Sequence, residues 1–155
     1  MQDLSALVAA GKSKLSNPDI YLTSFMAQVT PDTTDPQWQL HFYNPLEDTV
    51  YTYDAETGEI EGPSDVLKKE DFVPELDIAQ VRVSFEEALK KALEEAAPER
   101  EFVRIIVLLQ TIDDDAVWNI TFMNKQYHAL NIRLDAGDAH LIKKEPFQLF
   151  HYDQK

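Results

Sequence analysis

Apolar residues recur at helical spacing in two segments of the chain, one near the start and one near the middle. In the second segment Ser84 and Glu87 stand three residues apart, which is the spacing of a capping box at a helix start. The apolar stripe that follows predicts a helix with one buried face: it consists of Phe85, Ala88, Leu89, Ala92, Leu93 and Ala96. In the first segment Asp3 is a suitable cap, and the corresponding stripe consists of Leu4, Leu7, Val8 and Leu15.

Each predicted helix is followed by segments with the pattern of strands. Residues 20–29 and 102–110 are apolar and partly β-branched, and the second of these runs is apolar on nearly both faces, as in a central strand. The next segments alternate with period two, which predicts one buried and one wetter face. Their inward positions are Trp38, Leu40 and Phe42 in the first half, and Trp118, Ile120, Phe122, Leu130, Ile132 and Leu134 in the second.

A spacing of 80 residues relates the two halves. Trp38 and Trp118 are separated by it, and "WQLHFYN" aligns with "WNITFMN" without a gap. We therefore expect a duplication. The predicted fold class is α+β, with two tandem α-β-β-β units, each consisting of one helix packed on an antiparallel sheet of three to four strands. The expected boundaries are residues 1–62 for the first unit, 63–80 for a packed linker and 81–155 for the second unit.

Three short motifs resemble the PepSY domain family. They are the helix opening at residues 84–88, the middle strand at 118–122 and the closing turn "DAETGEI" at 54–60. The resemblance implies two tandem PepSY-like units with a cystatin-like fold. It also implies a role in binding or restraining a partner, and it brings no catalytic residues. The second half departs from the pattern, because Asp135-Ala136-Gly137-Asp138 lacks the Thr-Gly pair.

Composition and charge exclude several classes of function. The net charge is −14, and residues 1–80 hold 15 acidic against 4 basic side chains, which disfavours nucleic-acid binding. The chain has no cysteine and 4 glycines, and it lacks the glycine-rich phosphate motifs. No apolar run is long enough for membrane insertion. The sequence as it stands predicts a cytoplasmic protein, or an exported one if a leader has been removed.

Candidate chemistry is sparse. The four histidines, His41, His128, His140 and His151, show no metal-ligand spacing, and residues 113–115 lack the glycine and closing glutamate of a calcium loop. The turn at Asp54 and Gly58 has the composition of either a tight turn or an acidic ligand loop, and the loss of Thr-Gly in the second half favours the turn. We therefore predict no catalytic residues, no metal site and no cofactor.

The polar faces of the predicted strands remain as the candidate binding surface. Strand alternation places seven side chains there, namely Gln39, His41, Thr52, Asn119, Thr121, Asn131 and Arg133. We expect a non-enzymatic binding protein that recognises a protein, peptide or small polar ligand through a sheet face or edge, and a homodimer is compatible with this. Two alternatives stay open: an acidic decoy or inhibitor of a basic protein, and an enzyme with a site between the two units.

Overall fold

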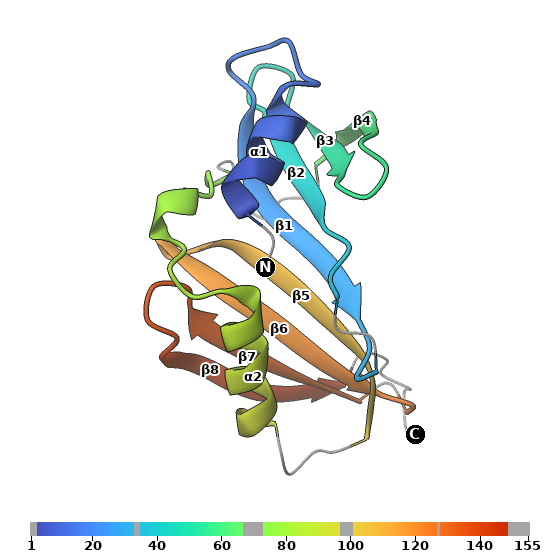
Figure 1. Cartoon of the computed structure of the whole chain (residues 1–155), viewed down its shortest axis with the longest axis vertical. Coiled ribbons are helices and arrows are strands. Elements are labelled where there is room, and N and C mark those ends of the chain that lie inside the picture. Colours follow the sequence, from blue (N-terminus) through green and yellow to red (C-terminus); the bar gives the residue numbers. More distant parts are fainter. Residues whose placement is uncertain (1–2, 33–34, 67–72, 97–100, 127, 149–155) are drawn as a thin grey trace, which may run out of the picture.

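A computed structural model describes residues 3–32, 35–66, 73–96, 101–126 and 128–148, without the side chains of residues 147 and 148. In this part of the chain, two α-helices and a short 3-10 helix accompany eight strands (Figure 1). The first half consists of α1 (Leu4–Lys12), β1 (Tyr21–Val29), β2 (Gln39–Asn44), β3 (Thr49–Asp54) and β4 (Ile60–Asp65). The second consists of η1 (Ile78–Gln80), α2 (Phe85–Glu95), β5 (Phe102–Ile112), β6 (Asp115–Asn124), β7 (His128–Asp135) and β8 (Leu141–Gln148).

All eight strands form one antiparallel sheet, in the order β4-β3-β2-β1-β5-β6-β7-β8. The prediction of two tandem units, each with its own sheet, is therefore wrong. The reason is the direct pairing of β1 with β5, which runs from Ser24 opposite Gln110 to Val29 opposite Ile105. A strand that is hydrogen-bonded on both sides has no free edge, so the apolar run at 102–110 is a central strand that joins the halves.

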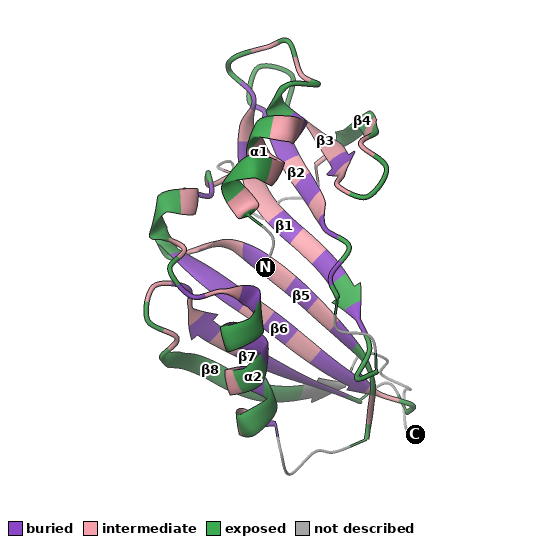
Figure 2. Ribbon diagram, viewed as in Figure 1, coloured by how far each residue is buried: buried purple, intermediate pink, exposed green. Residues whose placement is uncertain are grey.

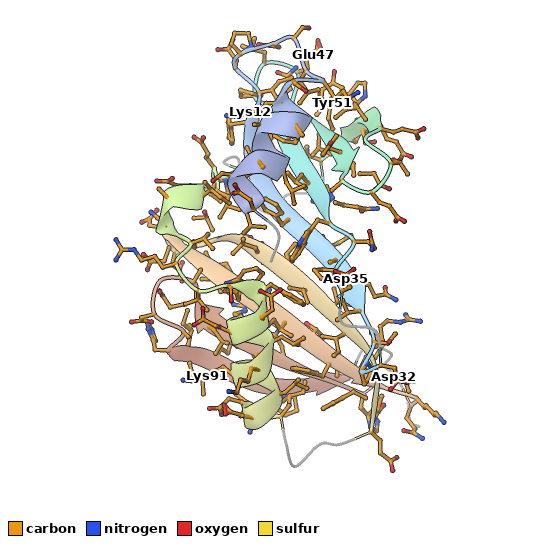
Figure 3. All side chains as sticks on the ribbon, viewed as in Figure 1. Lys12, Asp32, Asp35, Glu47, Tyr51 and Lys91 are labelled. Carbon is orange, nitrogen blue, oxygen red and sulfur yellow. The ribbon has the colours of Figure 1, made fainter. Side chains whose placement is uncertain are left out.

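Both helices lie on the same face of this sheet (Figure 1), and Lys12 on α1 and Lys91 on α2 mark their positions in Figure 3. The predicted caps are confirmed. Asp3 accepts hydrogen bonds from the amides of Ser5 and Ala6, and the Ser84 hydroxyl accepts one from the amide of Glu87. The helix-covered face holds the core, which Figure 2 shows as alternating buried positions along the central strands.

Aromatic side chains dominate the middle of the core. Trp38 and Trp118 are 1% and 0% exposed, which confirms their predicted burial. Their ring centroids lie 6.1 Å apart, and Phe85 of α2 contacts both indoles. The indole nitrogen of Trp118 donates a hydrogen bond to the carbonyl of Val83, so its polar atom is satisfied in the interior. Leu93, which we placed in the apolar stripe of α2, is instead 42% exposed.

The 80-residue spacing reappears in the register of the central pair. Ala27 lies opposite Val107, and these two residues are themselves 80 positions apart. On either side, Phe25 pairs with Leu109 and Val29 with Ile105. The pairing is therefore symmetric about Ala27 and Val107, and the two tryptophans meet across the same centre.

The segment between the halves packs on the sheet at several points. Leu76 is 2% exposed, and its amide donates to the carbonyl of Leu22. The hydroxyl of Tyr21 donates to the carbonyl of Val73, and that of Thr111 to the carbonyl of Glu75. Strand β4 continues to Asp65, so the first residues of the expected linker 63–80 belong to the sheet.

Candidate functional site

The seven predicted site residues all lie on the sheet face opposite the helices, which we call the open face. His41 is directly opposite Thr52, and Thr121 is opposite Asn131. One row of cross-strand neighbours runs across the sheet; it consists of Gln39, Met26, Leu108, Asn119, Arg133 and Lys143. Directly paired residues of a sheet share a face, so the register places both groups on one surface. Four strands separate Thr52 from Asn131, however, and the seven residues form two clusters.

The cluster on β6 and β7 is a hydrogen-bonded network. The side-chain amide of Asn131 donates to the amide oxygen of Asn119 at 2.5 Å and to the hydroxyl of Thr121 at 3.0 Å. Asn119 in turn donates to the amide oxygen of Gln110 on β5 at 3.1 Å. Asn131 is 9% exposed. Since each amide is held by its neighbours, these side chains have fixed directions before any ligand arrives.

Arg133 belongs to the same cluster but is not tied into the network. Its Nε atom is buried and has no hydrogen-bond partner in the described structure. A buried donor without an acceptor costs free energy, about 1–3 kcal/mol in typical cases. The arginine therefore differs from its neighbours, because their side-chain amides are satisfied within the sheet.

The cluster on β2 and β3 is centred on His41. The Nδ1 atom of His41 lies 2.8 Å from the hydroxyl oxygen of Ser24, and burial lowers the pKa of the imidazole. Beside them is a cavity of about 390 Å³ between the open face and the segment at Val73 and Pro74. His41 is therefore neutral at neutral pH, and its side chain is positioned by Ser24.

The Ser24–His41 pair does not have the arrangement of a nucleophilic site. Activation of a serine needs a base that is itself oriented by a third group, most often a carboxylate. In the part of the chain that the structure describes, no carboxylate is hydrogen-bonded to His41, and the lowered pKa makes the imidazole a weaker base. We interpret the pair as a polar contact that orients His41.

A second cavity, of about 430 Å³, lies on the helix side between the starts of α1 and α2. Its wall is largely apolar and includes Trp38, Phe85 and Val81, and its rim carries Arg82 and acidic residues. Its polar groups are partly committed already. Asp3 and Ser84 cap the two helices, and Glu87 lies within hydrogen-bond distance of Ser84.

The stretch 54–59 is a turn in the structure. The carboxylate of Asp54 accepts hydrogen bonds from the amides of Glu56 and Thr57, and Gly58 has a φ of 76°. The predicted tight turn, with Asp54 accepting from turn amides and Gly58 at positive φ, is confirmed. The turn at 135–140 repeats the same backbone bonds, from the amide of residue 139 to the carbonyl of Asp135 and from the amide of Asp135 to the carbonyl of residue 140.

That second turn contains a group that could hold a cation. Oxygen and nitrogen atoms of Asp135, Asp138 and His140 lie within 4.8 Å of one another. The hydrogen bonds of the turn account for this proximity. Asp135 accepts from two turn amides, and Asp138 accepts from the backbone and the ring of His140, which holds the pKa of Asp138 below its usual value. The arrangement is that of a turn rather than of a metal centre.

Sequence reasoning missed the apolar side chains of the open face. Met26, Ile106 and Leu108 lie on it by register, and all three are only partly buried. They form an apolar strip on β1 and β5 between the two polar clusters. The signal was the period-two pattern of these strands, which the almost continuous apolar character of 102–110 concealed.

Comparisons with known proteins identify the fold but no relative in sequence. No protein-family model matches the chain, and no curated protein matches it in sequence. A solved structure from Clostridium difficile 630, whose description reads "putative lipoprotein", is similar with a TM-score of 0.61. It shares 15% sequence identity, over 94% of this chain and 96% of that chain. At that identity the similarity concerns the fold alone. Within the described residues, neither helix has the length and apolar character needed to cross a bilayer.

Proposed function

We propose that this protein is a non-enzymatic binding protein of PepSY-like type that recognises a partner protein or peptide through the open face of its sheet. The observation that carries the proposal is the arrangement of that face. An apolar strip of Met26, Ile106 and Leu108 lies between two polar clusters, and the cluster at Asn119 and Asn131 is held by its own hydrogen bonds.

This arrangement has the anatomy of a recognition surface. Protein interfaces combine an apolar centre with a polar rim, and polar groups that are already oriented lose little entropy on binding. The helices cover the opposite face of the sheet (Figure 2), which leaves the open face as the larger uncovered surface of the strands. Recognition by surface contact is favoured over chemistry, because the Ser24–His41 pair is not oriented by a carboxylate among the described residues.

The test is selection of peptides from a phage-displayed random library on the wild-type protein. Leu108→Gln changes the centre of the apolar strip at nearly constant side-chain size, and we expect it to abolish binding of the selected peptides. Leu93→Gln is the matched control, because Leu93 is an exposed leucine of α2 on the opposite face. Circular dichroism and a thermal melt establish that both variants are folded. Equal loss of binding in both folded variants, or no loss in either, would refute recognition through the open face.

The decoy hypothesis makes a different prediction for the same complexes. Binding driven by the acidic first half should weaken steeply with ionic strength, because exposed charges are screened by salt. Binding centred on the apolar strip should change little between low and physiological salt. The salt dependence of the selected peptides therefore separates the two functions.

A further inference from the structure

Arg133 carries a buried hydrogen-bond donor that has no acceptor among the described residues. It lies on β7 in the row of open-face residues that contains Asn119. This donor is its Nε atom, which is buried and has no hydrogen-bond partner among the described residues. The guanidinium presents its donors in a rigid fork that fits a planar, bidentate acceptor. The Nε atom itself is enclosed, but the residue as a whole is only partly buried, so an acceptor from outside would meet the exposed part of the guanidinium.

The neighbouring strand adds a second, independent indication. Lys143 of β8 lies directly opposite Arg133, so two cationic residues occupy one cross-strand pair. Like charges in that position destabilise a sheet. The Nζ atom of Lys143 forms an ion pair with the Oε2 atom of Glu145 at 2.7 Å, and this contact lowers the pKa of the glutamate. The carboxylate of Glu145 is thus committed to the lysine, and Arg133 acts on it only at longer range.

Several other polar side chains on this face already have hydrogen-bond partners. Asn131 donates to both Asn119 and Thr121, and Asn119 donates to Gln110. Asp135, two residues along the same strand and therefore on the same face, uses one carboxylate oxygen to accept from the amides of Gly137 and Asp138. Within the described part of the chain, Arg133 is consequently the unsatisfied group of this cluster.

We propose that Arg133, with Lys143 beside it, receives a carboxylate of the partner, contributed by an aspartate or glutamate side chain that lies against the open face. This inference rests on the proposed function and names the chemistry of the partner at that site. A carboxylate pairs with the guanidinium fork through two parallel hydrogen bonds, and such charge-assisted bonds are among the strongest in proteins. It also relieves the repulsion between the two cations.

The charge of the whole chain restricts the partner further. With a net charge of −14, the protein repels a strongly acidic surface at long range. An isolated carboxylate in an otherwise neutral or basic surface avoids that repulsion and still satisfies Arg133. The partner therefore presents one acidic side chain among apolar and neutral groups, and the apolar groups contact the strip at Leu108.

The experiment follows the Nε–H resonance of Arg133 by ¹H–¹⁵N NMR. N-acetyl-glutamate N-methylamide is the probe, and N-acetyl-glutamine N-methylamide is its neutral isostere. We expect a saturable shift of the Arg133 signal with the glutamate probe and none with the glutamine probe. Arg133→Lys keeps the charge but removes the fork, and should weaken binding about tenfold, the equivalent of one charge-assisted hydrogen bond.

Arg82→Gln is the matched control, because Arg82 is an exposed arginine that lines the cavity on the helix side. It removes a positive charge on the other side of the sheet, a larger change in charge than Arg133→Lys makes, and should still leave the binding of the glutamate probe unchanged. An Arg133 signal that does not move, equal shifts with both probes, or equal weakening in Arg82→Gln would overturn the proposal. Binding of acetate as tight as that of the glutamate probe would overturn the assignment to a side chain of a protein.

Failure of this proposal is distinguishable from failure of the proposed function. If selected peptides lose binding in Leu108→Gln but bind Arg133→Gln as tightly as the wild type, recognition through the open face stands and the carboxylate assignment is wrong. If the glutamate probe binds at Arg133 while Leu108→Gln leaves peptide binding intact, the carboxylate site stands and the larger recognition surface is wrong.

Discussion

Replacing Gly11 by alanine tests how closely α1 packs on the sheet. A Cβ atom added at Gly11 would lie 2.7 and 2.8 Å from ring atoms of Phe42 and 3.2 Å from a ring atom of Tyr53. Ordinary contacts between carbon atoms are about 3.5–4.0 Å. Phe42 is 0% exposed, so its ring cannot turn out into solvent without disturbing the core. Either the helix must lift or the core must shift.

Two effects of opposite sign determine the outcome. Alanine inside a helix is favoured over glycine by about 1 kcal/mol. Overpacking a core costs about 1–3 kcal/mol. We expect the packing cost to exceed the propensity gain, so that Gly11→Ala lowers the free energy of unfolding by about 1 kcal/mol. That loss corresponds to a decrease in melting temperature of about 2–4 °C for a domain of this size.

The assay is equilibrium unfolding in urea, followed by tryptophan fluorescence, since both tryptophans are buried in the folded state. Ala9→Gly, at an exposed position of the same helix, isolates the propensity effect and should cost about 1 kcal/mol. Phe42→Leu combined with Gly11→Ala should be less destabilised than the sum of the single changes, because the smaller side chain makes room for the added methyl group. A Gly11→Ala protein that is more stable than the wild type by about 1 kcal/mol would show that α1 does not pack this closely.

Three further predictions concern the core, the turn at Gly58 and the partly buried His41. Trp38→Ala and Trp118→Ala should each lower the free energy of unfolding by about 3–5 kcal/mol in urea titrations, and a loss below about 1 kcal/mol at both sites would contradict their burial. Gly58→Ala should cost about 1 kcal/mol because its φ is positive, and millimolar calcium should leave the melting temperature of the wild type unchanged; a calcium-dependent rise that disappears in Asp54→Asn would reveal a metal site. Burial holds the pKa of folded His41 below its ordinary value of about 6.5, so the unfolded chain takes up the proton first, and stability should fall as the pH drops through 6.5. His41→Gln should lessen that fall in urea midpoints measured across this range, and identical pH profiles would argue against a buried neutral imidazole.

Local features of this fold could be read from the sequence. Asp3 and Ser84 are caps because their side chains accept from nearby amides, and Trp38 and Trp118 are buried because strand alternation places them on the inner face. The same alternation was sufficient to place Arg133 on the open face. These features depend on residues that lie a few positions apart, where spacing alone determines which groups can meet.

The joining of the two halves into one sheet could not be predicted from such local spacing. The pairing of β1 with β5 joins residues about 80 positions apart in the sequence. An apolar strand sequence does not indicate which other strand it will pair with. Two separate α-β-β-β units and one continuous sheet therefore predict the same pattern of apolar and polar residues along the sequence. The missing partner of Arg133 was hidden for a related reason. Whether a donor is satisfied depends on which side chains the tertiary structure places beside it, and its position in the strand does not reveal this.

The central pairing of β1 with β5 has a consequence for synthesis of the protein on the ribosome. β1 ends at Val29 and β5 begins at Phe102, so the 72 residues 30–101 are added after β1 before the first residue of β5 is made. At typical rates of about 5–20 residues per second, this takes roughly 4–15 s. During that time β1 can pair with β2 on one side only, and its other edge remains a template for strands of neighbouring chains. During synthesis, β1 is therefore an exposed edge strand, although it lies at the centre of the finished sheet. A chaperone that covers this edge would act on the first half of the chain before the second half is made.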